Sequence, residues 1–252
     1  MVPVFKSDYS IGKSILTLKD PSTDGPSSIF SILDKYKQNT LCLVEDSLTG
    51  FLKAYSQCEK FGVELYFGLR ISFCSDLKAE PEKGGDNTEH KVIVFSKSPE
   101  GCKLLNKIYS HAFTVGHGRI DSKYLESVWD GNHLALAIPF YDSFLFYNFF
   151  TFKTCIMDFD FANPTFFIEQ NNLPFDSFLK DQVISYCENL NYNTIKTKSI
   201  YYESRNDFAA YQTYKCICSR SSFGRGSSLE KPNLDHCASQ EFCMESWKEN
   251  NS

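Results

Sequence analysis

Short apolar runs alternate along the chain with segments whose apolar positions recur every three or four residues. The runs are rich in β-branched and aromatic residues and have the length of buried strands. This alternation predicts repeated strand–helix units, and therefore an α/β fold with a largely parallel sheet. The predicted strands are Thr40–Glu45, Val63–Phe73, Lys91–Ser96, His133–Pro139, Thr165–Glu169 and Thr194–Tyr201.

Helical spacing and capping residues mark the segments between the strands. Ser98 precedes a proline and a glutamate, which predicts a helix start with Ser98 as its N-cap. Ser204 and Asp207 have the spacing of a capping box, with aspartate in place of the usual glutamate. The predicted helices are Ser47–Phe61, a helix that starts at Ser98, Asp176–Leu190, and a helix from Ser204 to about Ile217.

The chain has 252 residues, 42% of them hydrophobic and 23% charged, which is typical of a folded globular protein. We predict one α/β domain at residues 1–219, followed by a loop and a helical tail at 220–252. Lys78–Glu89 and Arg220–Asn233 are polar and are predicted to be loops; the second is interpreted as a linker, with a nucleic-acid-contacting loop as the alternative. The aromatic block at 140–152 contains almost no basic residues, so we expect a core or a protein interface there.

Charge and hydropathy exclude some functions. A net charge of −5 argues against sequence-independent coating of DNA. The longest nearly apolar stretch, Phe144–Phe152, is about half of the roughly 20 residues that cross a bilayer. The N-terminus lacks the parts of a secretory signal. We therefore expect an intracellular, cytoplasmic protein without a membrane partner.

Several short motifs occur in an order that points to a family. They include Ser7-Asp8-Tyr9-Ser10, Leu43-Val44-Glu45-Asp46, Phe67-Gly68-Leu69 and a last segment, Glu241–Glu249. In this order they resemble the PHP (polymerase and histidinol phosphatase) domain that begins the alpha subunit of the bacterial C-family DNA polymerase III. The resemblance implies a distorted (β/α)7 barrel with its site at the carboxyl ends of the strands. It also implies that the last segment leads toward a polymerase palm.

Catalytic members of that family hold up to three divalent metals and hydrolyse phosphoesters, but most of the implied ligand positions differ here. Lysine and arginine are protonated at neutral pH and do not ligate metals. We therefore expect a metal-free pocket in which Lys6, Arg70 and Lys91 replace the metal charge and pair with Asp46 and with Glu45 or Asp8. The degenerate positions are Val4, Lys6, Asp46, Ser47, Arg70, Lys91, Ser199 and Tyr201.

The resemblance thus implies a non-catalytic PHP-like module without a cofactor. It would dock on, or regulate, a C-family DNA polymerase or another replisome protein, either as a split subunit or as a polymerase-binding mimic. Direct contact with nucleic acid is left open. The alternative is a metal-dependent phosphoesterase or 3′–5′ exonuclease with a rebuilt site, in which Asp46, His90 and Glu169 hold zinc or manganese.

Overall fold

The computed structural model describes residues 1–23, 27–78, 89–151, 157, 159–218 and 239–251. Its contacts divide the chain into two units. Unit 1 comprises Met1–Tyr66, Gln170–Pro174 and Thr197–Ser252, and unit 2 comprises Phe67–Glu169 and Phe175–Lys196. The predicted loop Arg220–Asn233, and the predicted domain boundary beside it, fall outside the described residues.

Unit 1 combines the first and the last parts of the chain. Its complete elements are β1 (Val2–Phe5), α1 (Ile29–Lys35), β2 (Thr40–Glu45), α2 (Phe51–Phe61), the short 3-10 helix η1 (Arg205–Asp207), α7 (Phe208–Cys218) and α8 (Met244–Glu249). Strand β1 is parallel to β2 and to β8 and lies between them, with Val4 opposite both Cys42 and Ser199.

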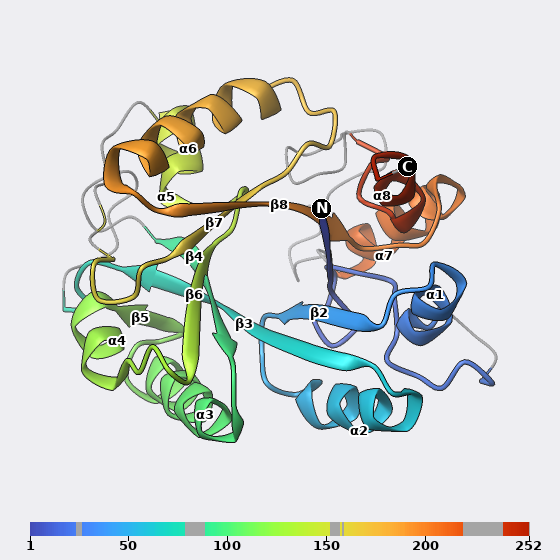
Figure 1. Ribbon diagram of the computed structural model, residues 1–252, viewed down its shortest axis with the longest axis horizontal. Helices are drawn as coiled ribbons and strands as arrows, with labels where there is room; N and C mark the ends of the chain where they lie inside the picture. Colours follow the sequence, from blue (N-terminus) through green and yellow to red (C-terminus); the bar gives the residue numbers. More distant parts are fainter. Residues whose placement is uncertain (24–26, 79–88, 152–156, 158, 219–238, 252) are drawn as a thin grey trace. The chain divides into compact units, whose positions relative to one another are not determined.

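In unit 2, strands and helices alternate along the chain from β4 to α6. Its complete elements are β4 (His90–Ser96), α3 (Pro99–Thr114), β5 (Arg119–Asp121), α4 (Ser122–Val128), β6 (Leu134–Ile138), α5 (Phe144–Thr151), β7 (Thr165–Ile168) and α6 (Asp176–Leu190). Helices α3 and α4 contact each other and both contact β5 (Figure 1). Strands β3 (Glu64–Cys74) and β8 (Asn193–Ile200) have residues in both units.

The strands pair in the order β2-β1-β8-β7-β6-β4-β3-β5, and β2 also pairs with β3. Seven strands therefore form a closed, mixed β-barrel of the α/β class. The predicted parallel arrangement is confirmed for β6, β7 and β8, and β2 and β8 are both parallel to β1, a strand that was not predicted. Strand β4 is the exception, because it is antiparallel to both β3 and β6. The polar sequence between β3 and β4 has no helical repeat that could carry a parallel crossover.

Local sequence signals explain where several elements begin. The Ser98 hydroxyl accepts a hydrogen bond from the Gly101 N–H at 3.1 Å and caps α3, as predicted. The capping box of Ser204 and Asp207 is also present, although it starts η1 before α7. Helix α2 begins at Phe51 and not at Ser47, because the Ser47 hydroxyl binds that of Thr49 in a turn before the helix.

The aromatic block contributes to the core of unit 2. Phe140, Tyr141 and Phe144 are buried, which confirms the predicted core role for this part of the block. The ring of Phe144 packs edge-on against His90 at 5.7 Å and Tyr186 at 5.4 Å between ring centroids. Among the described residues, no helix has both the length and the apolar character that a membrane crossing requires.

Candidate functional site

The carboxyl end of β2 in unit 1 carries a buried glutamate with several hydrogen-bond donors. The Glu45 side chain has no exposed surface. Its Oε1 accepts hydrogen bonds from the Ser7 N–H at 2.9 Å and the Ser7 hydroxyl at 2.6 Å, and its Oε2 accepts one from the Ser10 hydroxyl. Ser10 also accepts a hydrogen bond from the Asp46 N–H at 3.0 Å. Glu45 therefore fixes the turn after β1 to the end of β2.

A lysine supplies the positive charge next to this glutamate. Lys6 follows β1 directly, and its Nζ lies 2.9 Å from Oδ1 of Asp46, which follows β2. Only 8% of the Lys6 side chain is exposed, compared with 32% for Asp46, so the pair is shielded mainly on the lysine side. Because β1 and β2 are parallel neighbours, their carboxyl ends meet and bring these residues together. The predicted pairing of Lys6 with Asp46 is confirmed.

The other predicted positions of unit 1 have different surroundings. Val4 and Ser199 lie opposite each other on β1 and β8. Ser47 contacts Thr49. The ring of Tyr201 stacks on Phe242 at 5.5 Å and on Tyr211 at 5.8 Å between ring centroids. Val4 and Ser199 are thus neighbours across two paired strands. Tyr201 instead stacks on an aromatic residue of the last segment of the chain.

In unit 2, two predicted cations meet partners that the sequence did not indicate. Arg70 on β3 forms an ion pair with Asp142, which follows β6. The Nζ of Lys91 on β4 donates a hydrogen bond to the Ser72 hydroxyl at 2.6 Å, and its N–H donates one to the Asp142 carbonyl at 2.8 Å. Asp142 was missed because it lies in a loop and has a left-handed backbone with a φ of 64°.

The remaining two candidate ligands, His90 and Glu169, also belong to unit 2. His90 is buried, and its ring lies 5.4 Å from that of Phe73 and 5.7 Å from that of Phe144. Glu169 follows β7 and is 5% exposed. His90 therefore packs between aromatic rings on the side of β4 that faces the core of unit 2.

The carboxylates at the strand ends of unit 1 already have donors from the chain itself. In unit 1, Asp46 already pairs with an ammonium group, and both oxygens of Glu45 accept hydrogen bonds from serine donors. A metal would have to displace these donors from a buried carboxylate, which is costly. Within the described ranges, no group of three or more His, Cys, Asp or Glu side chains is arranged to hold a metal ion.

Burial raises the pKa of Glu45, and the hydrogen bonds from Ser10 and Ser7 and the charge of Lys6 offset only part of this rise. A raised folded-state pKa contributes stability that is complete below the unfolded-state pKa, about 4.3, and is lost as the pH rises through the folded-state pKa. We therefore expect the free energy of unfolding of the wild type, relative to that of Glu45→Gln, to decrease as the pH rises above the unfolded-state pKa of about 4.3. Urea unfolding of both proteins at increasing pH checks the prediction, and a constant difference would contradict it.

Burial also raises the pKa of Asp8, against the lowering effects of its backbone hydrogen bond and of Lys19. The Asp8 N–H donates to the Leu16 carbonyl at 2.8 Å, so this residue fixes a later turn of the same loop. The predicted partnership of Asp8 with the three cations stays a prediction.

Comparison of the chain with protein-family models and with curated proteins found no match.

Proposed function

We propose that the chain is a non-catalytic binding module with a PHP-type barrel, and that its partner is a C-family replicative DNA polymerase or another replisome protein. One observation supports the non-catalytic part of the proposal. At the ends of β1 and β2, both acidic side chains are satisfied by the chain's own donors, Glu45 by Ser7 and Ser10 and Asp46 by Lys6. The class of partner is inferred from the resemblance of the motifs alone.

The ammonium group of Lys6 can take over the electrostatic role of a metal ion without its chemistry. It balances the charge of Asp46, and its charge also acts on Glu45. An ammonium group has no open coordination position, so it neither acidifies a water molecule nor binds phosphate oxygens as a Lewis acid. A site neutralised in this way retains its fold and its surface for binding.

Metal content tests the non-catalytic part of the proposal. We expect purified protein, dialysed against zinc or manganese and then against buffer, to retain neither metal in stoichiometric amount by elemental analysis. We also expect no hydrolysis of a model phosphodiester when manganese is added. The matched variant is Asp46→Ala. Stoichiometric metal or hydrolysis in the wild type that is lost in this variant would favour the phosphoesterase or exonuclease alternative.

A purification from the native cell tests the partner. The tagged protein is captured after nuclease treatment, so that DNA cannot bridge the proteins, and the bound proteins are identified by mass spectrometry. Recovery of polymerase subunits is the expected result. Recovery of unrelated proteins alone would contradict the proposed partner while leaving the non-catalytic site unaffected.

A further inference from the structure

The last described segment of the chain, which ends in α8, is joined to residues 201–203 of unit 1 by main-chain hydrogen bonds. The Tyr201 N–H donates to the Phe242 carbonyl at 2.9 Å, the Met244 N–H donates to the Tyr202 carbonyl at 3.3 Å, and the Glu245 N–H donates to the Glu203 carbonyl at 3.1 Å. Tyr202 and Cys243 form a parallel bridge. These contacts fix Phe242 and Cys243 beside Tyr201 and Tyr202 and hold the first turn of α8 in place.

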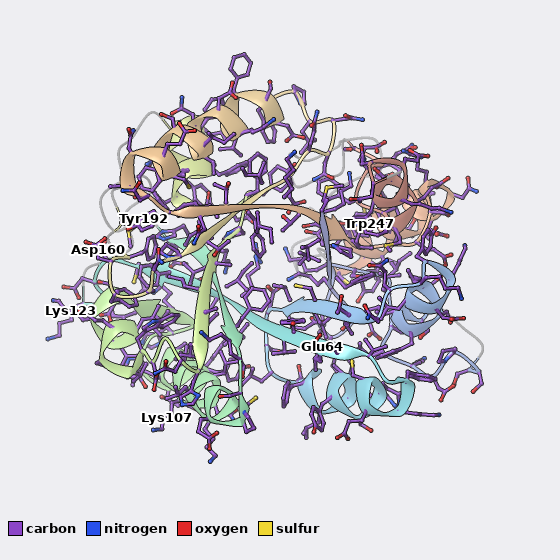
Figure 2. All side chains as sticks on the ribbon, viewed as in Figure 1. Glu64, Lys107, Lys123, Asp160, Tyr192 and Trp247 are labelled. Carbon is purple, nitrogen blue, oxygen red and sulfur yellow. The ribbon has the colours of Figure 1, made fainter. Side chains whose placement is uncertain are left out.

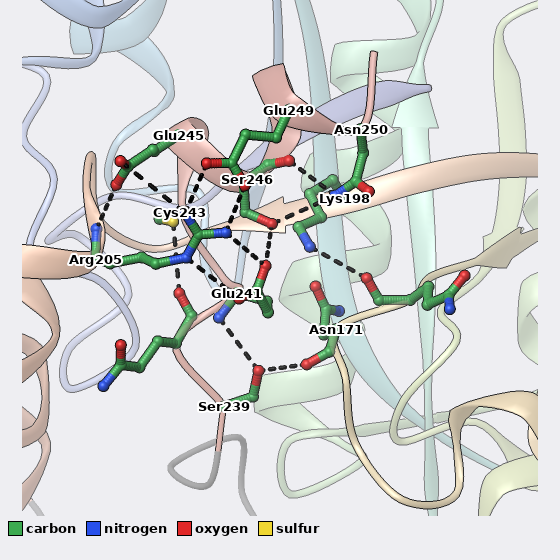
Figure 3. A network of polar contacts seen from close by, with 12 residues as sticks. Asn171, Lys198, Arg205, Ser239, Glu241, Cys243, Glu245, Ser246, Glu249 and Asn250 are labelled. Carbon is green, nitrogen blue, oxygen red and sulfur yellow. Dashed lines mark hydrogen bonds and ion pairs between the residues drawn. The ribbon is translucent and has the colours of Figure 1, made fainter. Parts of the chain in front are cut away.

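A single arginine binds the acidic side chains of this segment (Figure 3). Arg205 Nε and Nη2 donate to the two oxygens of Glu241 at 3.2 and 3.1 Å. Its Nη1 and Nη2 donate to the two oxygens of Glu249 at 2.8 and 2.7 Å. The Arg205 backbone N–H donates to Glu245 at 2.9 Å. Two bidentate carboxylates on one guanidinium give this contact strong geometric selectivity.

An aromatic stack and a second cation complete the surface. The fully buried Phe242 ring lies nearly parallel to Tyr201, with an interplanar angle of 14°. Burial acts to raise the pKa of Glu241, but hydrogen bonds from Arg205 and Ser246 and the charges of Arg205 and Lys198 bring it below its ordinary value. Lys198 has no exposed surface, and its Nζ donates to the Gln170 carbonyl at 3.1 Å.

The receiving surface and the bound segment come from separate stretches of the chain. Tyr201, Arg205 and Tyr211 lie within residues 198–211, whereas the bound segment lies within 239–251, and residues 219–238 separate it from α7. The contacts between the two stretches combine three main-chain hydrogen bonds, one aromatic anchor and an arginine with carboxylates. This is the combination by which proteins recognise short acidic peptides.

We propose that residues 198–211 form a peptide-recognition site that the chain occupies with its own segment 241–249. The ligand that fits is an acidic peptide of a partner protein, with glutamate and phenylalanine in sequence and further glutamates four and eight positions after the first. Such a peptide binds when segment 241–249 dissociates from residues 198–211. Because this segment belongs to the same chain, it competes with the peptide at a high effective concentration. This inference does not depend on the proposed polymerase partner.

A labelled synthetic peptide of residues 239–251 tests the site in the full chain. Three proteins are compared by fluorescence anisotropy: the wild type, a variant with Glu241→Gln, Phe242→Ala and Glu249→Gln, and the same triple variant with Arg205→Met. We expect saturable binding to the triple variant, at least about tenfold tighter than to the other two proteins. A folded triple variant that binds no better than the one that also carries Arg205→Met would overturn the proposal.

Hydrogen exchange of the wild type keeps the proposal testable if the triple variant does not fold. The amides of Met244 and Glu245 are expected to exchange through a local opening, while the amides of β8 stay protected. Arg205→Lys, which keeps the charge but loses the planar fork, is expected to accelerate the exchange of Met244 and Glu245 about tenfold without changing that of β8. Equal protection of the segment and of β8, changing together, would show that the segment is a fixed part of the core.

Discussion

Replacement of Glu45 by alanine is expected to lower the free energy of unfolding by about 3–5 kcal/mol. The change leaves the N–H and hydroxyl of Ser7 and the hydroxyl of Ser10 without their acceptor in a buried environment. Glu45→Gln is expected to cost less than about 2 kcal/mol, because its amide oxygen still accepts from Ser7.

The two tryptophans allow this loss to be followed in unit 1. Trp247 lies in α8 of unit 1 (Figure 2), and Trp129 belongs to unit 2. In a Trp129→Phe background, urea unfolding followed by Trp247 emission reports on unit 1. The control is Glu59→Ala, which removes an exposed glutamate of α2 and should change stability by less than about 0.5 kcal/mol. A Glu45→Ala protein as stable as this control would show that the buried serine donors need no carboxylate.

Gly101→Ala is expected to destabilise the protein by about 2–4 kcal/mol, although alanine is the better helix former by about 1 kcal/mol. A Cβ atom at position 101 of α3 would lie 2.3 Å from the His133 carbonyl oxygen and 2.8 Å from the Ser96 hydroxyl. The His133 carbonyl also accepts a hydrogen bond from the Lys97 N–H at 2.9 Å, so it cannot move away without weakening that contact.

The sign of the effect at position 101 separates sterics from helix propensity. Thermal and urea unfolding by circular dichroism measure it, with Asn106→Ala as the control, because Asn106 is an exposed residue of the same helix. The control should be neutral or stabilising by up to about 0.7 kcal/mol. A gain of stability in Gly101→Ala would mean that α3 leaves room for a methyl group next to the His133 carbonyl, just before β6.

Periodicity and capping were sufficient to predict much of the fold. The bounds of α6 and β2 match the predicted Asp176–Leu190 and Thr40–Glu45, because each has a regular apolar pattern that ends at polar residues. Strand β1 was not predicted, since it has only four residues and includes Pro3. Helix α5 was not predicted either, because its nearly continuous apolar sequence shows no polar face.

Contacts of the candidate site could be predicted only where both residues directly follow neighbouring parallel strands. Lys6 and Asp46 follow parallel neighbouring strands, so the pairing of their strands brings them together. The partner of Arg70 depends on the path of the loop that holds Asp142, which local sequence does not specify. The contacts of Arg205 join residues 36 and 44 positions apart, a separation at which no periodicity applies.

The position of β1 between β2 and β8 affects the order in which a newly synthesised chain folds. Residues 2–5 need residues 197–200 to complete their hydrogen bonds, so the pairing of β1 with β8 has to wait until residues 197–200 have been synthesised. Strands β3, β4, β5 and β6 all lie between residues 64 and 138 and can pair much earlier. Contacts that are close in sequence form first, so we expect co-translational folding to start in unit 2, and we expect the side of β1 that pairs with β8 to stay without its partner strand until residues 197–200 are made.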